Sequence, residues 1–421
     1  MKPISPFGLP IGISVSIWSL VGLLRLILNY LPFRKKRHWD WGRKLRPSDI
    51  AVLLPAHNEE LVIRSSIQAL KQMLDKKQIY VVSDGSHDKT YRRAREENCH
   101  VSKLEPGLGK GRALVYLLTR YHLFDRYKLI FIVDADTRID VTCVKRALPL
   151  FKDPDIGVCF ASSRIRWPQH FIPRLKYYFI AYRERLNRLL QYFLIYGQTW
   201  KYTNVNYVIP GFATIYRSNV LKQLEIDTPG LLIEDFNLAF QFHKKKLGKI
   251  GYSPSLIGWD QYPDNLVDYW KQVRRWNIGF FQTVKKNGLW FSMFWLALGT
   301  FTIEVFLNSI YILFLPLLLL FLIIPALGVS HQILDMFSFL YRNFGPYQSL
   351  NLRDIFIGTY LIDYMFTVII GLIGRKPQFI FYGLFFFFMH FVASLILLSS
   401  VIPGFFGSSS GRWVSPKRQR I

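Results

Sequence analysis

Residues 129–137 read LIFIVDADT, which is an apolar run followed by two aspartates two positions apart. A short, continuous apolar run is typical of a parallel strand covered on both faces. Two further runs of this kind, Ile50–Leu54 and Ile79–Ser83, come earlier, and the helical patterns Glu59–Met73 and Lys110–Tyr121 separate the three runs. Strand, turn and helix repeated in this order predict a doubly wound α/β sheet.

The composition places this α/β part beside a membrane. The chain of 421 residues is 51% hydrophobic, with a mean hydropathy of +0.16, too apolar for an ordinary soluble protein and too charged for membrane spans alone. Segments long enough to cross a bilayer are Ile11–Leu31, Trp290–Leu327, Ile355–Ile373 and Phe379–Ile402. Because the second segment fits either one long tilted helix or two helices, we expect four or five spans.

Basic residues predict the orientation of the chain. Lys and Arg cluster between Arg34 and Arg46, and by the positive-inside rule this flank faces the cytoplasm. The basic tail favours a cytoplasmic C-terminus, whereas the Arg375–Lys376 hairpin favours the opposite side. The predicted organisation is an N-terminal transmembrane helix (1–32), a basic cytoplasmic linker (33–49), an α/β domain (50–260), an amphipathic interfacial helix (261–288), C-terminal transmembrane helices (289–403) and a basic tail (404–421).

A net charge of +26 and a pI of about 9.9 restrict the partners. Loops facing anionic lipid are the first interpretation, and an anionic substrate such as a nucleotide is the second. Nucleic acid ranks last, because we find no helix-turn-helix, zinc-finger or RNP pattern. The three cysteines, Cys99, Cys143 and Cys159, are odd in number and lack metal-site spacing, which favours reduced thiols.

Polar residues follow each predicted strand, at the edge where ligands of such sheets bind. The first strand leads into Pro55, Ala56 and Glu59, although helix capping explains Glu59 equally well. The second ends at Asp84, which could accept a hydrogen bond from the ring N–H of a base.

Asp134 and Asp136 follow the third strand. Two buried carboxylates this close would repel each other, and a divalent cation removes that cost and can bridge to a diphosphate. The alternative is one solvated turn aspartate and one helix cap.

Two further motifs supply a cation and a base. In EPGLGKGRAL, residues 105–114, glycines allow close approach of a ligand, and Lys110 at a helix N-terminus favours anions. This is not a Walker A loop, because the spacing and the Lys-Ser/Thr ending are absent. Glu234 and Asp235 follow another apolar run, and a carboxylate there suits a general base, although an acid pair at a helix start fits equally.

The segment Gln272-Val273-Arg274-Arg275-Trp276 lies on an amphipathic stretch, Asp264–Lys286, that resembles a helix on a membrane surface. The functional interpretation is that Arg275 binds a diphosphate and Trp276 stacks on a sugar face. A second interfacial helix is expected at Arg183–Tyr196.

In this order the chain carries Ser83-Asp84-Gly85, Asp134-Ala135-Asp136, Glu234-Asp235 and Gln272-x-x-Arg275-Trp276. Together these motifs resemble the processive family 2 glycosyltransferases, such as cellulose synthase, hyaluronan synthase and bacterial poly-N-acetylglucosamine synthase. The resemblance covers roughly Ile50 to Trp276. Where family members usually have Thr or Ser before the Glu-Asp pair, this chain has Ile233.

The resemblance implies a Rossmann-like GT-A fold and an inverting hexosyltransferase that uses a nucleotide sugar, with UDP as the expected nucleotide. It implies that Asp84 contacts the base, that Asp134 and Asp136 hold Mg²⁺ or Mn²⁺, and that Asp235, beside Glu234, is the general base. The donor site would also include Pro55, Ala56, Glu59, Lys110, Gln272, Arg275 and Trp276.

The expected function is sugar transfer to a growing polysaccharide by a multi-pass protein of the plasma (inner) membrane, with its catalytic domain in the cytoplasm. One alternative is a non-processive enzyme that glycosylates a membrane lipid. The other is a non-catalytic nucleotide-binding or transport protein, which would not need paired acids at two strand ends. The expected partners are the nucleotide sugar, a polysaccharide or glycolipid acceptor and membrane lipids, but no nucleic acid; the need for an accessory subunit stays open.

Overall fold

An eight-stranded mixed β-sheet forms the centre of the α/β domain in the computed structural model, which describes residues 45–165, 167, 174–192, 204–326, 332, 335–336 and 352–407. The strands lie in the order β3-β2-β1-β4-β7-β6-β8-β5. They are β1 (Ile50–Ala56), β2 (Ile79–Asp84), β3 (His100–Leu104), β4 (Leu129–Val133), β5 (Arg138–Ile139), β6 (Ile156–Arg164), β7 (Ala213–Arg217) and β8 (Lys249–Trp259).

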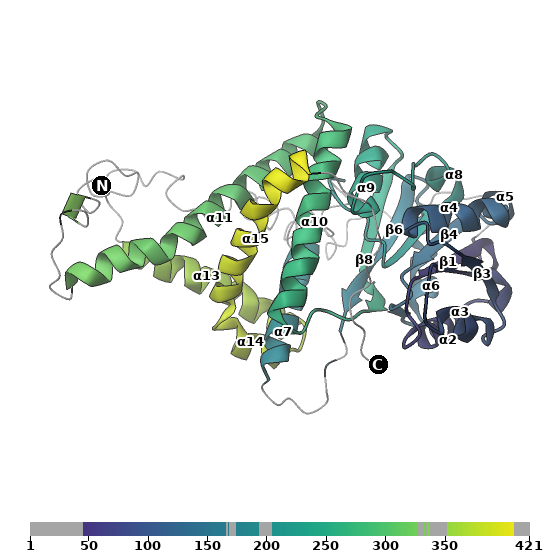
Figure 1. The fold of residues 1–421 in the computed structure, drawn as a ribbon, viewed down its shortest axis with the longest axis horizontal. Coiled ribbons are helices and arrows are strands. Elements are labelled where there is room, and N and C mark those ends of the chain that lie inside the picture. The colour runs from purple at the N-terminus through teal and green to yellow at the C-terminus, as the bar shows by residue number, and fades with distance from the viewer. Residues whose placement is uncertain are drawn as a thin grey trace, which may run out of the picture.

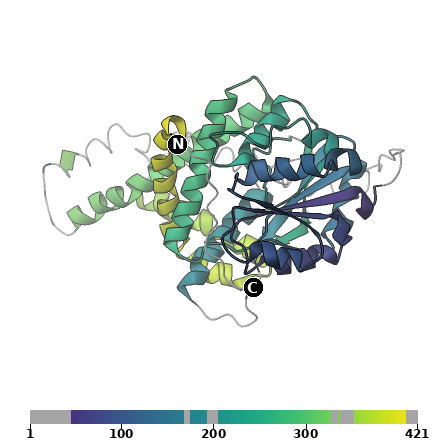
Figure 2. The ribbon, with the colours of Figure 1, turned by 45° about the vertical axis from the view of Figure 1, so that its right-hand side comes forward.

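The three strands expected from the sequence are β1, β2 and β4, and they are parallel neighbours. All residues of these strands are buried, because helices cover both faces of this half of the sheet. Helix α4 (Lys110–Arg120) covers one face, and α2 (Ile63–Lys71) and α3 (Thr90–Arg95) cover the other (Figure 2). This burial explains why each strand is a continuous apolar run rather than an alternating one.

The sheet is only partly parallel, which corrects the expectation of a doubly wound parallel sheet. Strand β7 runs antiparallel to both β4 and β6, and β5 runs antiparallel to β8. Strands β6 and β8 pair parallel with each other, but polar residues, Gly and Pro interrupt their sequences, so neither is recognisable as a continuous apolar run. The remaining short elements are α5 (Leu123–Arg126), α6 (Cys143–Ala147), α8 (Ser218–Leu221), α9 (Glu234–Lys244), η2 (Pro47–Asp49), η3 (Lys76–Gln78) and η4 (Leu150–Lys152).

A layer of long helices lies beside the sheet (Figure 1). It contains α7 (Leu175–Tyr192), α10 (Leu266–Asn287), α11 (Met293–Ala326), α13 (Leu352–Ile373), α14 (Pro377–Gly383) and α15 (Phe386–Phe406). The amphipathic stretch expected at Asp264–Lys286 corresponds to α10, and the one expected at Arg183–Tyr196 begins earlier, as α7. Helix α10 packs along α15 and also against α9, so it joins the helical layer to the α/β domain.

Two helices of the described residues are long and apolar enough to cross a membrane: Met293–Phe314 within α11, and α15. The apolar part of α13, Tyr360–Ile373, is shorter. The expectation of four or five spans is therefore not met in this part of the chain. The apolar segment near Trp290–Leu327 is a single helix, and the last expected span is divided into α14 and α15. The span expected at Ile11–Leu31 lies outside the described residues.

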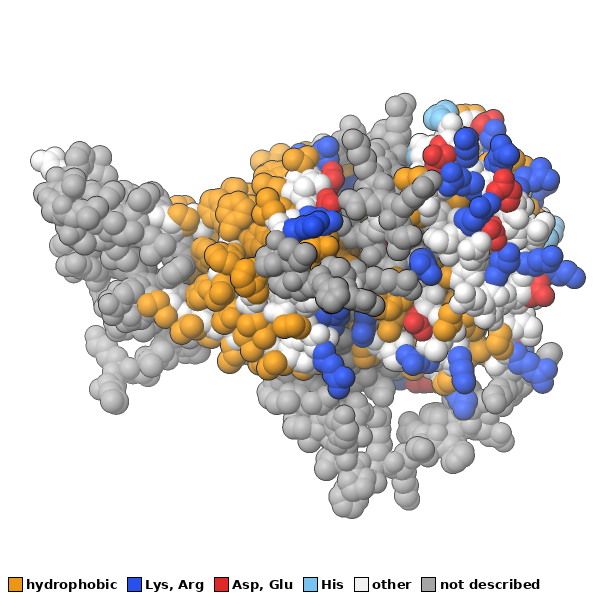
Figure 3. Space-filling model, turned by 90° about the horizontal axis from the view of Figure 1, so that it is seen from below, with side chains coloured by type: hydrophobic (Ala, Val, Ile, Leu, Met, Phe, Trp, Pro, Cys, Tyr) orange, Lys and Arg blue, Asp and Glu red, His pale blue; other side chains and the backbone are white. Residues whose placement is uncertain are grey.

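The polarity of the surface also differs between the α/β domain and the helical layer (Figure 3). Apolar side chains gather over the helical layer, whereas Lys, Arg, Asp and Glu lie mainly over the α/β domain. On α11 the exposed apolar residues Leu296, Ile303, Leu307 and Phe314 recur at helical spacing and form one outward face. An exposed apolar face of this extent is typical of contact with lipid or with another protein.

Candidate active site

A single pocket of about 820 Å³ brings together most of the residues expected in the donor and catalytic sites. Its wall combines the end of β4, the starts of α4 and α9, and one face of α10, segments far apart in the sequence. The predicted residues that line it are Glu59, Lys110, Asp134, Asp136, Glu234, Asp235, Gln272, Arg275 and Trp276.

Lys110 connects two of the acidic motifs. It is the first residue of α4, and Gly109 before it adopts a φ of 93°, which glycine tolerates without strain. The Lys110 Nζ lies 3.0 Å from Asp134 Oδ1 and 2.8 Å from Glu234 Oε1. One ammonium group therefore holds the end of β4 against the start of α9.

Lys110 and the carboxylates around it change one another's pKa values. Burial acts against the charged lysine, but Asp134, Glu234 and Asp235 outweigh it and hold the pKa of Lys110 well above its ordinary value. Burial also acts against an ionised Glu234, yet Lys110 and, less strongly, Arg275 keep the pKa of Glu234 below its ordinary value. Burial raises the pKa of Asp134, and Lys110 only partly opposes this rise.

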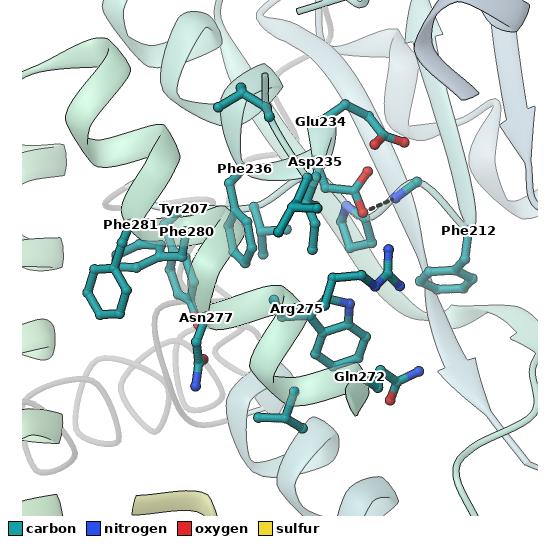
Figure 4. A pocket seen from close by; sticks show the side chains of 18 of the residues that line it. Tyr207, Phe212, Glu234, Asp235, Phe236, Gln272, Arg275, Asn277, Phe280 and Phe281 are labelled. Carbon is teal, nitrogen blue, oxygen red and sulfur yellow. Dashed lines mark hydrogen bonds between the residues drawn. The ribbon is translucent and has the colours of Figure 1, made fainter. Parts of the chain in front are cut away.

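Asp235 has the properties of a proton acceptor. Burial and the neighbouring Glu234 raise the pKa of Asp235 to about 7, against the opposing effect of Lys110. Its Oδ2 accepts a hydrogen bond of 2.9 Å from the backbone N–H of Gly211 (Figure 4), whereas its Oδ1 is buried without a hydrogen-bond partner among the described residues. A carboxylate that titrates near neutral pH and keeps one oxygen uncommitted suits general base chemistry.

The acidic side of the pocket fits a divalent cation. Asp134 and Asp136 both line it, and burial, with a smaller contribution from Asp136, raises the pKa of Asp134 against the opposing effect of Lys110. Among the described residues no group of three or more His, Cys, Asp or Glu side chains could hold a metal by itself. Mg²⁺ is commonly held by one or two carboxylates together with substrate phosphates, and this donor set matches that arrangement.

Asp84, Pro55 and Ala56 do not line the pocket, in contrast to the expectation from the sequence. The two oxygens of Asp84 accept hydrogen bonds of 2.7 Å from the backbone N–H groups of Leu108 and Gly109. Asp84 therefore anchors the loop that precedes Lys110, and its contact with a base stays a prediction. Pro55 and Ala56 are buried inside β1, where they belong to the sheet.

Gln272, Arg275 and Trp276 share one face of α10, because positions three and four apart on a helix are neighbours. In Figure 4 the Arg275 side chain extends toward the region of Asp235 and Phe212. The guanidinium of Arg183 lies 4.5 Å from the ring centroid of Trp276. One face of the indole is thus already covered, and sugar stacking on Trp276 stays a prediction.

Sequence reasoning missed several residues of this pocket. Tyr207, Gly211 and Phe212 precede β7, and Arg183 comes from α7. The adjacent Pro210 and Gly211 mark a turn in the sequence, which was the available signal. A Cβ at Gly211 would lie 2.6 Å from both Asp235 Oδ1 and Lys110 Nζ, so a larger residue here would have to displace the ends of these side chains.

Comparison with known proteins shows similarity to one family of enzymes. The sequence model described as glycosyl transferase family group 2 matches residues 129–329. The probable glycosyltransferase YdaM of Bacillus subtilis (strain 168) is 27% identical over 264 residues, which are 60% of this chain and 60% of the relative. The poly-β-1,6-N-acetyl-D-glucosamine synthase of Staphylococcus aureus (strain COL) is 26% identical over 252 residues, 56% of this chain and 57% of the relative. The match thus spans less than two thirds of these curated relatives.

Among solved structures, the mannosyltransferase PcManGT from Pyrobaculum calidifontis, in complex with GDP-Man and Mn²⁺, is similar with a TM-score of 0.57. The similarity covers 93% of this chain and 95% of that one, at 14% sequence identity, so it establishes a shared fold. The α/β part is accordingly a GT-A-like domain with a mixed sheet. The chain thus shares this fold and is similar in sequence to family 2 glycosyltransferases over about half of its length.

Proposed function

We propose that the protein transfers a sugar from a nucleotide-sugar donor to an acceptor hydroxyl at the membrane, with inversion at the anomeric carbon and with Mg²⁺ or Mn²⁺ as cofactor. One observation supports this proposal most strongly: a single pocket around Lys110 contains four acids and one arginine, which are Asp134, Asp136, Glu234, Asp235 and Arg275. Three distant segments supply these groups, and a purely structural role would not need them in one pocket.

In the proposed reaction the acceptor oxygen forms a bond to the anomeric carbon while the bond from that carbon to the diphosphate breaks. Asp235 takes the proton of the acceptor hydroxyl, and the diphosphate leaves with the nucleoside. The Gly211 N–H fixes one oxygen of Asp235, so the other oxygen can face the acceptor. Lys110 and Arg275 offset the negative charge of the leaving diphosphate.

Asp134 and Asp136 are the residues that would hold the cation, which supplies charge stabilisation on the departing diphosphate. Lys110 has a second role in this scheme. Because it pairs with Asp134 and Glu234 at once, it favours the ionised form of both carboxylates and holds them in position before the donor binds.

For the acceptor, our first candidate is a growing polysaccharide. The Gln272-x-x-Arg275-Trp276 motif and the distant relationship to a poly-N-acetylglucosamine synthase support it. In this scheme the enzyme is a multi-pass protein of the plasma membrane whose catalytic domain faces the cytoplasm, where nucleotide sugars are made.

A membrane lipid is the second candidate acceptor, and the lining of the pocket favours it. Beyond α10 the pocket continues between α11 and α15, and Leu298, Phe301, Val305 and Phe306 line this part. Aliphatic and aromatic side chains suit hydrocarbon chains better than they suit the hydroxyl groups of a glycan.

The experiment that tests the transfer reaction uses the full chain in lipid nanodiscs with a panel of nucleotide sugars. We expect one donor to be consumed with release of the nucleoside diphosphate. Asp235→Asn should lower this turnover by about 100-fold or more, because general base catalysis commonly contributes 100- to 10,000-fold.

Asp125→Asn is the matched control, because Asp125 is an exposed aspartate on α5 that does not line the pocket. Full turnover by Asp235→Asn, or no turnover of any donor by the wild-type protein, would contradict the proposal. Long products would identify a polysaccharide acceptor, and single-sugar lipids would identify a lipid acceptor.

A further inference from the structure

Arg183 is a basic residue of the pocket that the proposed reaction does not use. It projects from α7, a helix outside the family motifs, and lines the same pocket as Asp235. Its guanidinium lies 4.5 Å from the ring centroid of Trp276 and 5.7 Å from that of Tyr262. Its Nε is buried without a hydrogen-bond partner, and no ion pair to Arg183 occurs among the residues that the structure describes.

The neighbouring arginines of α7 are paired, which makes Arg183 distinct. Arg185 forms an ion pair with Asp363 and donates a hydrogen bond of 3.0 Å to Thr367 Oγ1. Arg188 lies 2.6 Å from Glu184 Oε1. Two arginines of α7 therefore have acidic partners, one on α13 and one on α7 itself. The third, Arg183, lines the pocket and contacts aromatic rings, without an acidic partner among the described residues.

Two acids, Glu184 beside Arg183 in the sequence and Asp260 on the pocket wall, have other hydrogen-bond partners. Glu184 pairs with Arg188 and accepts a hydrogen bond of 2.6 Å from Trp167 Nε1. Asp260, on the pocket wall, accepts a hydrogen bond of 2.7 Å from the backbone N–H of Gln261. A partly buried guanidinium without an acid is costly, and stacking on aromatic rings offsets only part of that cost. An anionic group of a bound ligand would compensate the positive charge of the Arg183 guanidinium.

The pocket on the far side of Trp276 is mainly apolar, although Thr302, Asn308 and Ser309 of α11 and His390 and Ser394 of α15 also line it. Phe280 and Phe281 follow Trp276 along α10, and Figure 4 places them on the side of the pocket opposite Phe212. The ring of Phe281 lies 6.1 Å from that of Phe306 on α11 and 5.4 Å from that of Phe405 on α15. Along the pocket, the lining therefore changes in three steps. Carboxylates line the end near Asp235, the guanidinium of Arg183 follows, and mainly apolar side chains line the part between α11 and α15.

We infer that Arg183 binds the phosphate of an anionic phospholipid acceptor, whose hydroxyl-bearing head group faces Asp235 and whose apolar chains lie between α11 and α15. The inference rests on the proposed transfer reaction and selects the lipid among its two acceptors. A guanidinium presents paired N–H donors that match phosphate oxygens, and neutralising a phosphate beside Trp276 satisfies the unpaired Arg183. The donor diphosphate has separate partners, Lys110 and Arg275.

The test compares two soluble probes that differ only in the phosphoglycerol head: dihexanoyl phosphatidylglycerol and dihexanoylglycerol. Each is added to the full chain in phosphatidylcholine nanodiscs, and binding is measured together with nucleotide-sugar turnover. We expect the wild-type protein to bind the phosphate-bearing probe at least about tenfold more tightly, which is the range for one charge-assisted contact. We also expect only this probe to accept a sugar.

Two variants separate charge from packing. Arg183→Met keeps an apolar stem over Trp276 and should remove the preference for phosphate without changing the affinity for dihexanoylglycerol or for the nucleotide. Arg183→Lys should keep part of the preference. Lys176→Gln is the control, because Lys176 stacks on Tyr177 at 5.1 Å on the same helix but does not line the pocket.

The inference is overturned if Arg183→Met retains the wild-type preference, or if it weakens both probes and the nucleotide equally, as a purely structural role would. It is also overturned if neutral oligosaccharides are extended and dihexanoyl phosphatidylglycerol does not compete with them. Failure of the transfer reaction appears separately, as absent turnover with every donor, while probe binding still reports on Arg183.

Discussion

The backbone N–H of Gly211 donates a 2.9 Å hydrogen bond to Oδ2 of Asp235. This bond fixes the carboxylate that we propose as the base, and it connects the loop before β7 to the start of α9. The same glycine has no room for a side chain, since a Cβ would lie 2.6 Å from Asp235 Oδ1. The position of the base therefore depends on a residue that carries no chemistry of its own.

Gly211→Ala should lower kcat by about 100-fold, because a displacement of the order of 1 Å at a catalytic group has effects of that size. The added methyl must push aside Asp235 or Lys110. The measurement is steady-state turnover of the nucleotide sugar, with thermal unfolding to verify the fold. Gly299→Ala on α11 is the control, because nothing lies within 4 Å of a Cβ there. Equal activity of both variants would contradict the positioning role of Gly211.

Activity should fall as the pH drops below neutral. Burial raises the pKa of Asp235 to about 7, and a base works only when ionised, so kcat/KM should decrease about tenfold per pH unit below 7. Above that value the profile should be level until another group titrates. A pH series from 5.5 to 8.5 measures this, and the residual activity of Asp235→Asn should lack the acidic limb. A wild-type rate that stays constant down to pH 5.5 would exclude Asp235 as the base.

Lys110→Met should reduce turnover by about 100-fold, since removing one preorganised donor from a developing negative charge costs 100- to 1,000-fold. The protein should also unfold at a lower temperature, because Asp134 and Glu234 lose their shared cation. Lys110→Arg should recover part of both losses. Lys103→Met serves as the control, because Lys103 pairs with the exposed Glu105 and does not line the pocket. The role assigned to Lys110 would be wrong if its Met variant matched this control.

Removal of divalent cations with EDTA should abolish turnover, and Mn²⁺ or Mg²⁺ should restore it. Asp136→Asn should need more metal for half-maximal rate and should lose more than about 100-fold at fixed metal, because metal stabilisation of charge is worth several kcal/mol. The pair Asp134 and Asp136 is the testable unit, and Asp140→Asn, just outside the pocket lining, is its control. Full activity in EDTA would remove the metal from the proposed mechanism.

The local pattern predicted the first half of the sheet well. Strands β1, β2 and β4 are continuous apolar runs because helices cover both faces, and this pattern is visible without any knowledge of neighbours. The local pattern did not predict the second half of the sheet, which contains β5 to β8. Strand β7 pairs antiparallel with β4 and β6, and such pairing depends on contacts between residues that are about 54 to 88 positions apart.

By itself the sequence determined the apolar strands, the acids at their ends and the amphipathic helix with Gln272, Arg275 and Trp276, because each depends on neighbours within a few residues. Only the tertiary structure decided that Asp84 anchors a loop, that Gly211 holds Asp235, and that Arg183 lies over Trp276 with no acidic partner in the part of the chain that the structure describes. Contacts of this kind join segments that the chain separates widely. Their geometry is set by how the sheet and the helical layer pack together, and no local pattern encodes it.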